Sequence, residues 1–243
     1  MRSLSAIGLP WPFPPRRSRR RTVRRGAKGR WQRIGRRTAI CLALGLAGCA
    51  SAPPPAALSS AQQAEIGRIE TYLNGIGSLT ARFAETWPNG TVTPGTVHVL
   101  RPGRLRLDYD PPATIGIVAD GRSFIYHDAR TGQLSYEPLS ETPVGLLLAR
   151  RIDLGGNATI TGFAVADGVA RLALVDKQHP GQGTLTLVLD EQPMALREWV
   201  LTDPHGTVTR MRLSDIVLNG PVDPAMFGVR DWLPPGAPPP PGE

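Results

Sequence analysis

The chain has 243 residues, a formal net charge of +8 at pH 7 and a pI near 10.4, values that favour a polyanionic partner such as nucleic acid. The distribution of the charge excludes that class of partner. All 20 acidic residues lie after Cys49, against 15 basic ones, so the chain from Cys49 onward carries a net charge of −5. We therefore expect no nucleic-acid binding.

An export signal is predicted over residues 1–48. An Arg-rich segment without acidic residues precedes a short apolar run, Ala39 to Ala47, that ends in small residues. The run is too short to span a bilayer, which takes about 20 apolar residues. Leu46-Ala47-Gly48-Cys49 resembles the bacterial lipobox, in which the cysteine is lipidated and becomes the first mature residue. Two interpretations stay open: lipidation at Cys49, or an ordinary signal peptide that contains a cysteine.

A tether and then a helix follow the signal. The prolines of residues 49–58 predict an extended tether. Ser60 to Gln63 fits a capping box, and the apolar residues that follow recur at helical spacing, namely Ile66, Ile69, Tyr72, Leu73 and Ile76. The pattern predicts an amphipathic helix over about 60–75, ended by Gly75 and Gly77.

The apolar period then changes to two, which is typical of strands that bury one face, as in Leu105, Leu107 and Tyr109. Turn signals separate about eleven such strands, at Pro94-Gly95, Pro102-Gly103, Asp120-Gly121, Thr131-Gly132, Asp167-Gly168, Gln192-Pro193 and His205-Gly206. Thr142 as a cap, Pro143 at the first helical position and a leucine run predict a short helix over 142–150. The fold class is therefore mainly β with α, a single antiparallel domain over 59–230, followed by a disordered Pro-rich tail over 231–243.

Catalytic signatures are missing from the sequence. It contains no Gly-x-Ser-x-Gly, phosphate-loop or His-Glu-x-x-His motif and no metal-spaced His or Cys cluster. The closest acid and base pair, in Asp203-Pro204-His205-Gly206, is composed of β-turn residues. We expect a binding domain without catalytic residues, metal or cofactor; loss of function at one polar residue with binding intact would favour an enzyme instead.

Several motifs, in this order and spacing, resemble the outer-membrane lipoprotein carrier family, LolA. They are Arg82-Phe83, residues 101–112 (RPGRLRLDYDPP), Ile117 to Gly121, Tyr126 to Asp128, Gln133, Thr142-Pro143 with Leu146-Leu147, Asp203 to Thr209 and Asn219 to Phe227. The resemblance runs from about Ile66 to Val229. It implies an unclosed β-barrel with helices lying over its mouth as a lid.

The resemblance also implies a function and partners. The expected protein is a periplasmic chaperone that binds the acyl chains of lipoproteins in an apolar cavity and delivers them to the outer membrane. Its partners would be acylated lipoproteins, an inner-membrane release complex and the inner leaflet of the outer membrane, and we expect a monomer. Ala50 after Cys49 favours anchoring to the outer membrane. Because a soluble carrier needs no lipobox, an acceptor of the LolB type stays open, as does a lipid-sensing envelope protein.

Candidate site residues follow from the alternation and from the resemblance. The residues expected on an apolar concave face are Leu105, Leu107, Tyr109, Ile115, Ile117, Phe124, Tyr126, Leu146 and Leu147. Each could equally be ordinary core, because alternation identifies the face and not what fills it. The resemblance implies that Arg101 hydrogen-bonds to the helical lid and holds the empty form closed; the alternative is a solvated loop arginine.

Overall fold

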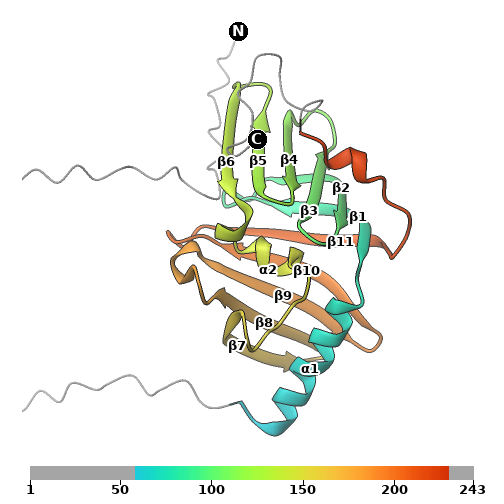
Figure 1. Ribbon diagram of the computed structural model, residues 1–243, viewed down its shortest axis with the longest axis vertical. Helices are drawn as coiled ribbons and strands as arrows, with labels where there is room; N and C mark the ends of the chain where they lie inside the picture. The colour runs from blue at the N-terminus through green and yellow to red at the C-terminus, as the bar shows by residue number, and fades with distance from the viewer. Residues whose placement is uncertain (1–57, 230–243) are drawn as a thin grey trace, which may run out of the picture. The chain divides into compact units, whose positions relative to one another are not determined.

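The computed structural model describes residues 58–229, which form eleven strands and two α-helices (Figure 1). The export signal with Cys41 and Cys49, the tether up to residue 57 and the predicted tail lie outside the described residues. The elements, in chain order with three 3₁₀ turns (η), are α1 Ser60–Asn74, β1 Ser78–Thr86, β2 Val92–Leu100, β3 Arg104–Tyr109, β4 Ile115–Asp120, β5 Ser123–Asp128, β6 Gln133–Pro138, η1 Leu139–Glu141, α2 Val144–Leu148, β7 Ala158–Ala166, β8 Val169–Asp176, η2 Pro180–Gln182, β9 Thr184–Glu191, β10 Met194–Thr202, β11 Val208–Leu218 and η3 Pro224–Phe227.

All eleven strands belong to one antiparallel sheet with the order β6-β5-β4-β3-β2-β1-β11-β10-β9-β8-β7. The first and last strands pair at its centre, while β6 and β7 are its two edges. The sheet is therefore not closed, and the expectation of an unclosed antiparallel sheet of about eleven strands is confirmed. The connection from β6 to β7 runs from one edge to the other and carries η1 and α2.

The first helix starts at Ser60 as predicted, but its N-cap lies one residue earlier than the expected capping residue. Ser59, not Ser60, is the N-cap: its hydroxyl accepts from the Gln62 backbone N–H at 3.3 Å, and the Gln62 side chain accepts from the Ser59 N–H at 2.9 Å. The sequence contains two overlapping Ser-x-x-Gln patterns, so the motif alone could not choose between them. Ile66, Ile69 and Leu73 form the buried side of α1.

The turn predicted at Pro94-Gly95 is wrong, because both residues lie inside β2, where they pair with Ala84 and Phe83 of β1. A Cβ atom on Gly95 would lie 2.4 Å from the Phe83 ring and 2.5 Å from the backbone oxygen of Asp108. Glycine is needed there so that the ring can pack across β2. The chain instead reverses between β1 and β2 around Gly90, whose φ of +81° suits glycine.

The short helix predicted over 142–150 exists as α2, but Thr142 does not cap it. The Thr142 hydroxyl donates to the backbone oxygen of Leu139 at 2.8 Å, which closes the preceding 3₁₀ turn, and the N-cap position belongs to Pro143. The other predicted turns separate consecutive strands as expected.

Both α-helices lie on one face of the sheet, the face that carries Leu107, Leu187 and Met211 and is here called the inner face. In Figure 1, α2 lies in front of the sheet between its two halves. Among the described residues, no helix combines the length and the apolar composition needed to cross a membrane.

The outer face is also covered over β4 and β5, where Val118 and Ile125 are fully buried against Val229. The chain reaches this position through η3, whose Phe227 is buried and whose Met226 oxygen accepts a hydrogen bond from Arg106 Nη1 at 2.9 Å. Met226 and Phe227, at the end of the motif Asn219 to Phe227, thus fasten the end of the described chain to the sheet.

Candidate functional site

Two apolar cavities lie between the inner face and the helices. The first is lined by the side chains of six strands and of α2, which are Glu85, Leu105, Leu107, Ile117, Phe124, Val144, Trp199, Leu201, Thr209 and Met211. Its volume is about 30 Å³. That volume admits few water molecules and no acyl chain of a dozen methylenes, so this conformation is a closed one.

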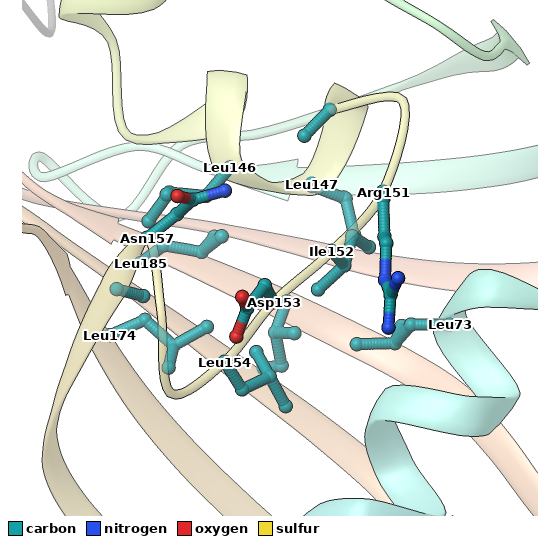
Figure 2. A pocket seen from close by; sticks show the side chains of 13 residues that line it. Leu73, Leu146, Leu147, Arg151, Ile152, Asp153, Leu154, Asn157, Leu174 and Leu185 are labelled. Carbon is teal, nitrogen blue, oxygen red and sulfur yellow. The ribbon is translucent and has the colours of Figure 1, made fainter.

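The second cavity lies beneath α1 and the segment after α2 (Figure 2), and its volume is about 20 Å³. Leu73 reaches it from α1, Leu146 and Leu147 from α2, and Leu174 and Leu185 from β8 and β9. Residues 149–154 form its cover. Together, the two cavities are lined by strands from both halves of the sheet, and α2 contributes side chains to both.

Most of the predicted lining residues meet at these cavities. Leu105, Leu107, Ile117 and Phe124 line the first cavity, and Leu146 and Leu147 line the second. The remaining three are placed elsewhere. Tyr109 and Tyr126 are buried without lining either cavity, and half-buried Ile115, at the first position of β4, lines a separate open groove beside Pro111 and Pro112.

Sequence reasoning missed the contribution of the second half of the chain. The lining residues it overlooked include Trp199 and Met211 in the first cavity and Leu174, Leu185 and Leu187 in the second. The alternation of Leu185, Leu187 and Leu189 in β9 carries the same period-two signal as β3 and could have identified the face. Ile152 and Leu154 had no such signal, because they lie outside any regular element.

Arg101, between β2 and β3, connects the sheet to both covering segments. Its Nη1 donates to the backbone oxygens of Leu73 and Ile76 at 2.6 and 3.1 Å, at the end of α1. Its Nε and Nη2 donate to the Ala149 oxygen at 2.9 and 2.7 Å, just after α2. Every acceptor is neutral, and burial lowers the pKa of the guanidinium because desolvation disfavours its charge.

Further polar contacts hold the cover in place. The Asn74 side chain at the end of α1 both donates to and accepts from the Ile152 backbone, at 2.8 and 2.9 Å. The Leu154 N–H donates to Glu70 at 3.0 Å, and the Leu196 N–H of β10 donates to the Tyr72 hydroxyl at 3.0 Å. The cover therefore rests on apolar side chains below and is fastened at its rim by hydrogen bonds that can exchange with water.

One acidic side chain lies inside the apolar region. Glu85 of β1 lines the first cavity, is 5% exposed and accepts a hydrogen bond from the Tyr109 hydroxyl at 2.5 Å. Desolvation by burial raises the pKa of Glu85 to about 7, and the bond from Tyr109 opposes that rise.

The one acid and base pair noted in the sequence is a turn, as expected. Asp203 Oδ1 accepts from the backbone N–H groups of His205 and Thr207, each at 2.8 Å, and the Gly206 N–H donates to the Asp203 oxygen. Within residues 58–229, no three His, Cys, Asp or Glu side chains cluster closely enough to hold a metal ion.

Comparison with known proteins points to one family. The model of the family described as "Outer membrane lipoprotein carrier protein LolA" matches residues 74–230. The outer-membrane lipoprotein carrier protein of Methylococcus capsulatus is 27% identical over 179 residues, which cover 70% of this chain and 85% of that protein. Its counterpart in Methylobacillus flagellatus is 29% identical over 137 residues, covering 55% and 66%. A solved LolA superfamily protein from Nitrosomonas europaea aligns with 69% of this chain and 98% of its own, at 13% identity and a TM-score of 0.39.

Proposed function

The chain belongs to the outer membrane lipoprotein carrier protein LolA family, and we propose that it carries lipoproteins through the periplasm to the outer membrane with their acyl chains held against the inner face of its sheet. Exposing an acyl chain to water costs roughly 0.8 kcal/mol per methylene, on the order of 10 kcal/mol per chain. A carrier must remove that surface from water, and an apolar sheet face under a detachable cover can do so. We assign no chemical step to it.

The observation that carries the proposal is how the two cavities are covered: α2, through Val144, covers the first, and α1 with residues 149–154 covers the second. The cover of the second cavity presents Leu73, Ile152 and Leu154 to it, and the bonds that fasten this cover are part-buried hydrogen bonds from one guanidinium to backbone oxygens. Lifting α1, α2 and residues 149–154 would expose the inner face at both cavities to cargo. The lining would then be the predicted residues Leu105, Leu107, Ile117, Phe124, Leu146 and Leu147 with the additions from β8 to β11.

Arg101 acts in this proposal as the latch that favours the closed, empty form. Hydrogen bonds from a charged donor contribute roughly 1.5–3 kcal/mol net, a tenfold to hundredfold shift of the closed-to-open balance. Cargo cannot bind until the hydrogen bonds of Arg101 are broken. The free energy spent on breaking them keeps binding weak enough for release.

Arg101→Leu is therefore expected to keep the fold, to retain an acyl probe at least about tenfold more tightly and to slow its transfer to acceptor vesicles. Fluorescence titration and a transfer assay measure both effects, and circular dichroism checks the fold. Arg104→Leu is the matched control, because the Arg104 side chain makes no hydrogen bond to the described residues. Equal or weaker retention by a folded Arg101→Leu protein would remove the latch from the mechanism.

We further propose that the protein is attached to the outer membrane through lipidated Cys49, because Leu46 to Cys49 resembles a lipobox at the end of an export signal. The same motif favours a second candidate function, that of an anchored acceptor which receives lipoproteins from a soluble carrier. The proposed contacts are acylated lipoproteins, an inner-membrane release complex for the carrier role, and the inner leaflet of the outer membrane.

Cys49→Ala is expected to release the protein from the membrane fraction into the soluble periplasmic fraction, since it removes the acceptor of the lipid. Cell fractionation and the mass of the mature protein measure the change. Cys41→Ala, eight residues earlier and within the predicted signal, is the control. An unlipidated mature mass together with unchanged fractionation of Cys49→Ala would refute the anchor.

A further inference from the structure

Glu85 is an acidic side chain in a cavity whose other lining is apolar apart from Thr209. The sheet register places it beside Met211 of β11, which in turn pairs with Trp199 of β10, and all three line the first cavity. Glu85 is only 5% exposed. A carboxyl group is an unfavourable choice for a position that only has to fill apolar space, so its presence calls for a polar function.

The hydrogen bonding of this carboxyl group is half complete. Oε2 accepts from the Tyr109 hydroxyl, and among the described residues no other donor reaches the group. Tyr109 is itself fixed by two aromatic neighbours, since its ring packs edge-on against Phe83 at 5.1 Å between centroids and is stacked against Trp87 at 6.4 Å. The structure thus orients the carboxyl group of a residue that lines the cavity and leaves Oε1 without a hydrogen bond from the described residues.

We propose that Glu85 binds the polar head of an acylated cargo by accepting a hydrogen bond from an N–H group that lies next to the acyl chains. This inference rests on the proposed carrier function and deepens it, because it names the chemistry that separates acylated peptides from simple acyl esters. The N–H group can be the ammonium of an unacylated N-terminal cysteine or the amide formed when that amine is acylated. At pH 8, above the folded pKa of Glu85, the ionised carboxyl group can only accept, so an ester, which has no such donor, leaves Oε1 without a partner.

The test compares three ligands by competition against a fluorescent acyl probe. Two are diacylglyceryl-cysteine peptides, one with a free α-amine and one with that amine palmitoylated, and the third is methyl palmitate, which has no N–H or O–H donor. The main variant is the double substitution Glu85→Leu with Tyr109→Phe, which removes the acceptor without leaving the tyrosine hydroxyl unpaired. Glu85→Gln removes the charge and keeps an acceptor oxygen.

The double variant is expected to bind the cargo-like peptide about tenfold more weakly, the size of one hydrogen bond to a charged group, and to bind methyl palmitate more tightly. If the ammonium is the donor, Glu85→Gln loses about as much affinity for the free-amine peptide. If the amide is the donor, Glu85→Gln binds the palmitoylated peptide nearly as well as wild type, and only the double variant loses. Either pattern supports Glu85 as the head-group site and shows whether the ammonium or the amide donates the hydrogen bond.

Glu198→Gln is the matched control, since Glu198 of β10 lies opposite Arg212 of β11 on the other face of the same sheet. Its Oε1 accepts a hydrogen bond from Arg210 Nη1 at 3.3 Å. Equal changes for peptides and methyl palmitate in the double variant, or no change for any of them, would overturn the proposal while leaving the carrier function intact. Failure of all three ligands to bind the wild-type protein would overturn the carrier function together with this inference. Thermal unfolding of each variant confirms that the domain is folded.

Discussion

Leu107→Glu is expected to unfold the domain or to abolish uptake of an acyl probe. Leu107 is 5% exposed, lies mid-strand in β3 and lines the first cavity together with Glu85. The substitution would place a second carboxyl group in this apolar space, where burial of an unpaired charge costs several kcal/mol and a like charge adds to the cost. Urea denaturation measures the loss of stability, and probe fluorescence measures uptake.

Val217→Glu is the control for that substitution, because Val217 in β11 is 55% exposed and the same change there leaves the carboxylate in water. Its stability should stay within about 0.5 kcal/mol of wild type. A stable Leu107→Glu protein with normal uptake would show that acyl chains bind elsewhere than in the first cavity.

The stability of the domain should fall as the pH rises from about 5 to 8, and Glu85→Gln should remove this part of the dependence. The pKa of Glu85 is about 7 in the folded state against 4.5 for the unperturbed group. Between these values the folded state holds one more proton than the unfolded state, so the stability of the domain decreases with pH. The contribution of Glu85 is fully lost once the pH passes the folded pKa. At about 1.4 kcal/mol per pKa unit, the full loss is about 3 kcal/mol.

Other groups must be separated from this effect. Tyr109 and Tyr126 interact with Glu85 but stay neutral in this range, because burial raises the pKa of Tyr126 to about 12 and that of Tyr109 well above its usual value. Desolvation lowers the pKa of His98, so the folded state releases a proton that the unfolded histidine keeps, and this contribution rises with pH. Wild type and Glu85→Gln share the contribution of His98, so it cancels when the stability of one protein is subtracted from that of the other.

Urea denaturation of both proteins at pH 5, 6, 7 and 8 measures the difference. The free energy of unfolding of wild type should fall relative to that of Glu85→Gln by a few kcal/mol over this range, most steeply below pH 7. Parallel curves for the two proteins would mean that the Glu85 carboxyl group is solvated in the folded state, contrary to its burial.

The locations of the elements were accessible from the sequence because they depend on local patterns. The helix over 60–74 follows from apolar residues at helical spacing and a capping motif, and the prediction missed only the cap residue and the last position, each by one residue. The period-two strands and their turns follow from alternation and from residues such as Gly121 and Gly168, whose positive φ suits glycine. Pro94-Gly95 misled because its glycine accommodates the Phe83 ring of the neighbouring strand, a contact that the local sequence does not contain.

The site could be predicted from the sequence only in part, because it also depends on contacts that the local sequence does not contain. Alternation correctly placed Leu105, Leu107 and Ile117 on one face, and the resemblance to the family pointed to Arg101. Alternation also places Glu85 on the face of Leu79, Ala81 and Phe83, but an acid at the end of a strand gives no sign that it is buried. Its partner Tyr109 lies 24 residues away in the sequence.

The sequence by itself determined which residues of this protein alternate, where the chain turns and which faces are apolar, because these properties depend on neighbours a few positions apart. The tertiary structure decided which segments of the chain pack against the apolar face. It paired β1 with β11, carried α2 across the sheet from one edge to the other, and brought the carbonyl groups of Leu73 and Ala149 to one guanidinium. These contacts join segments far apart in the sequence, and burial of apolar surface on the inner face favours their formation.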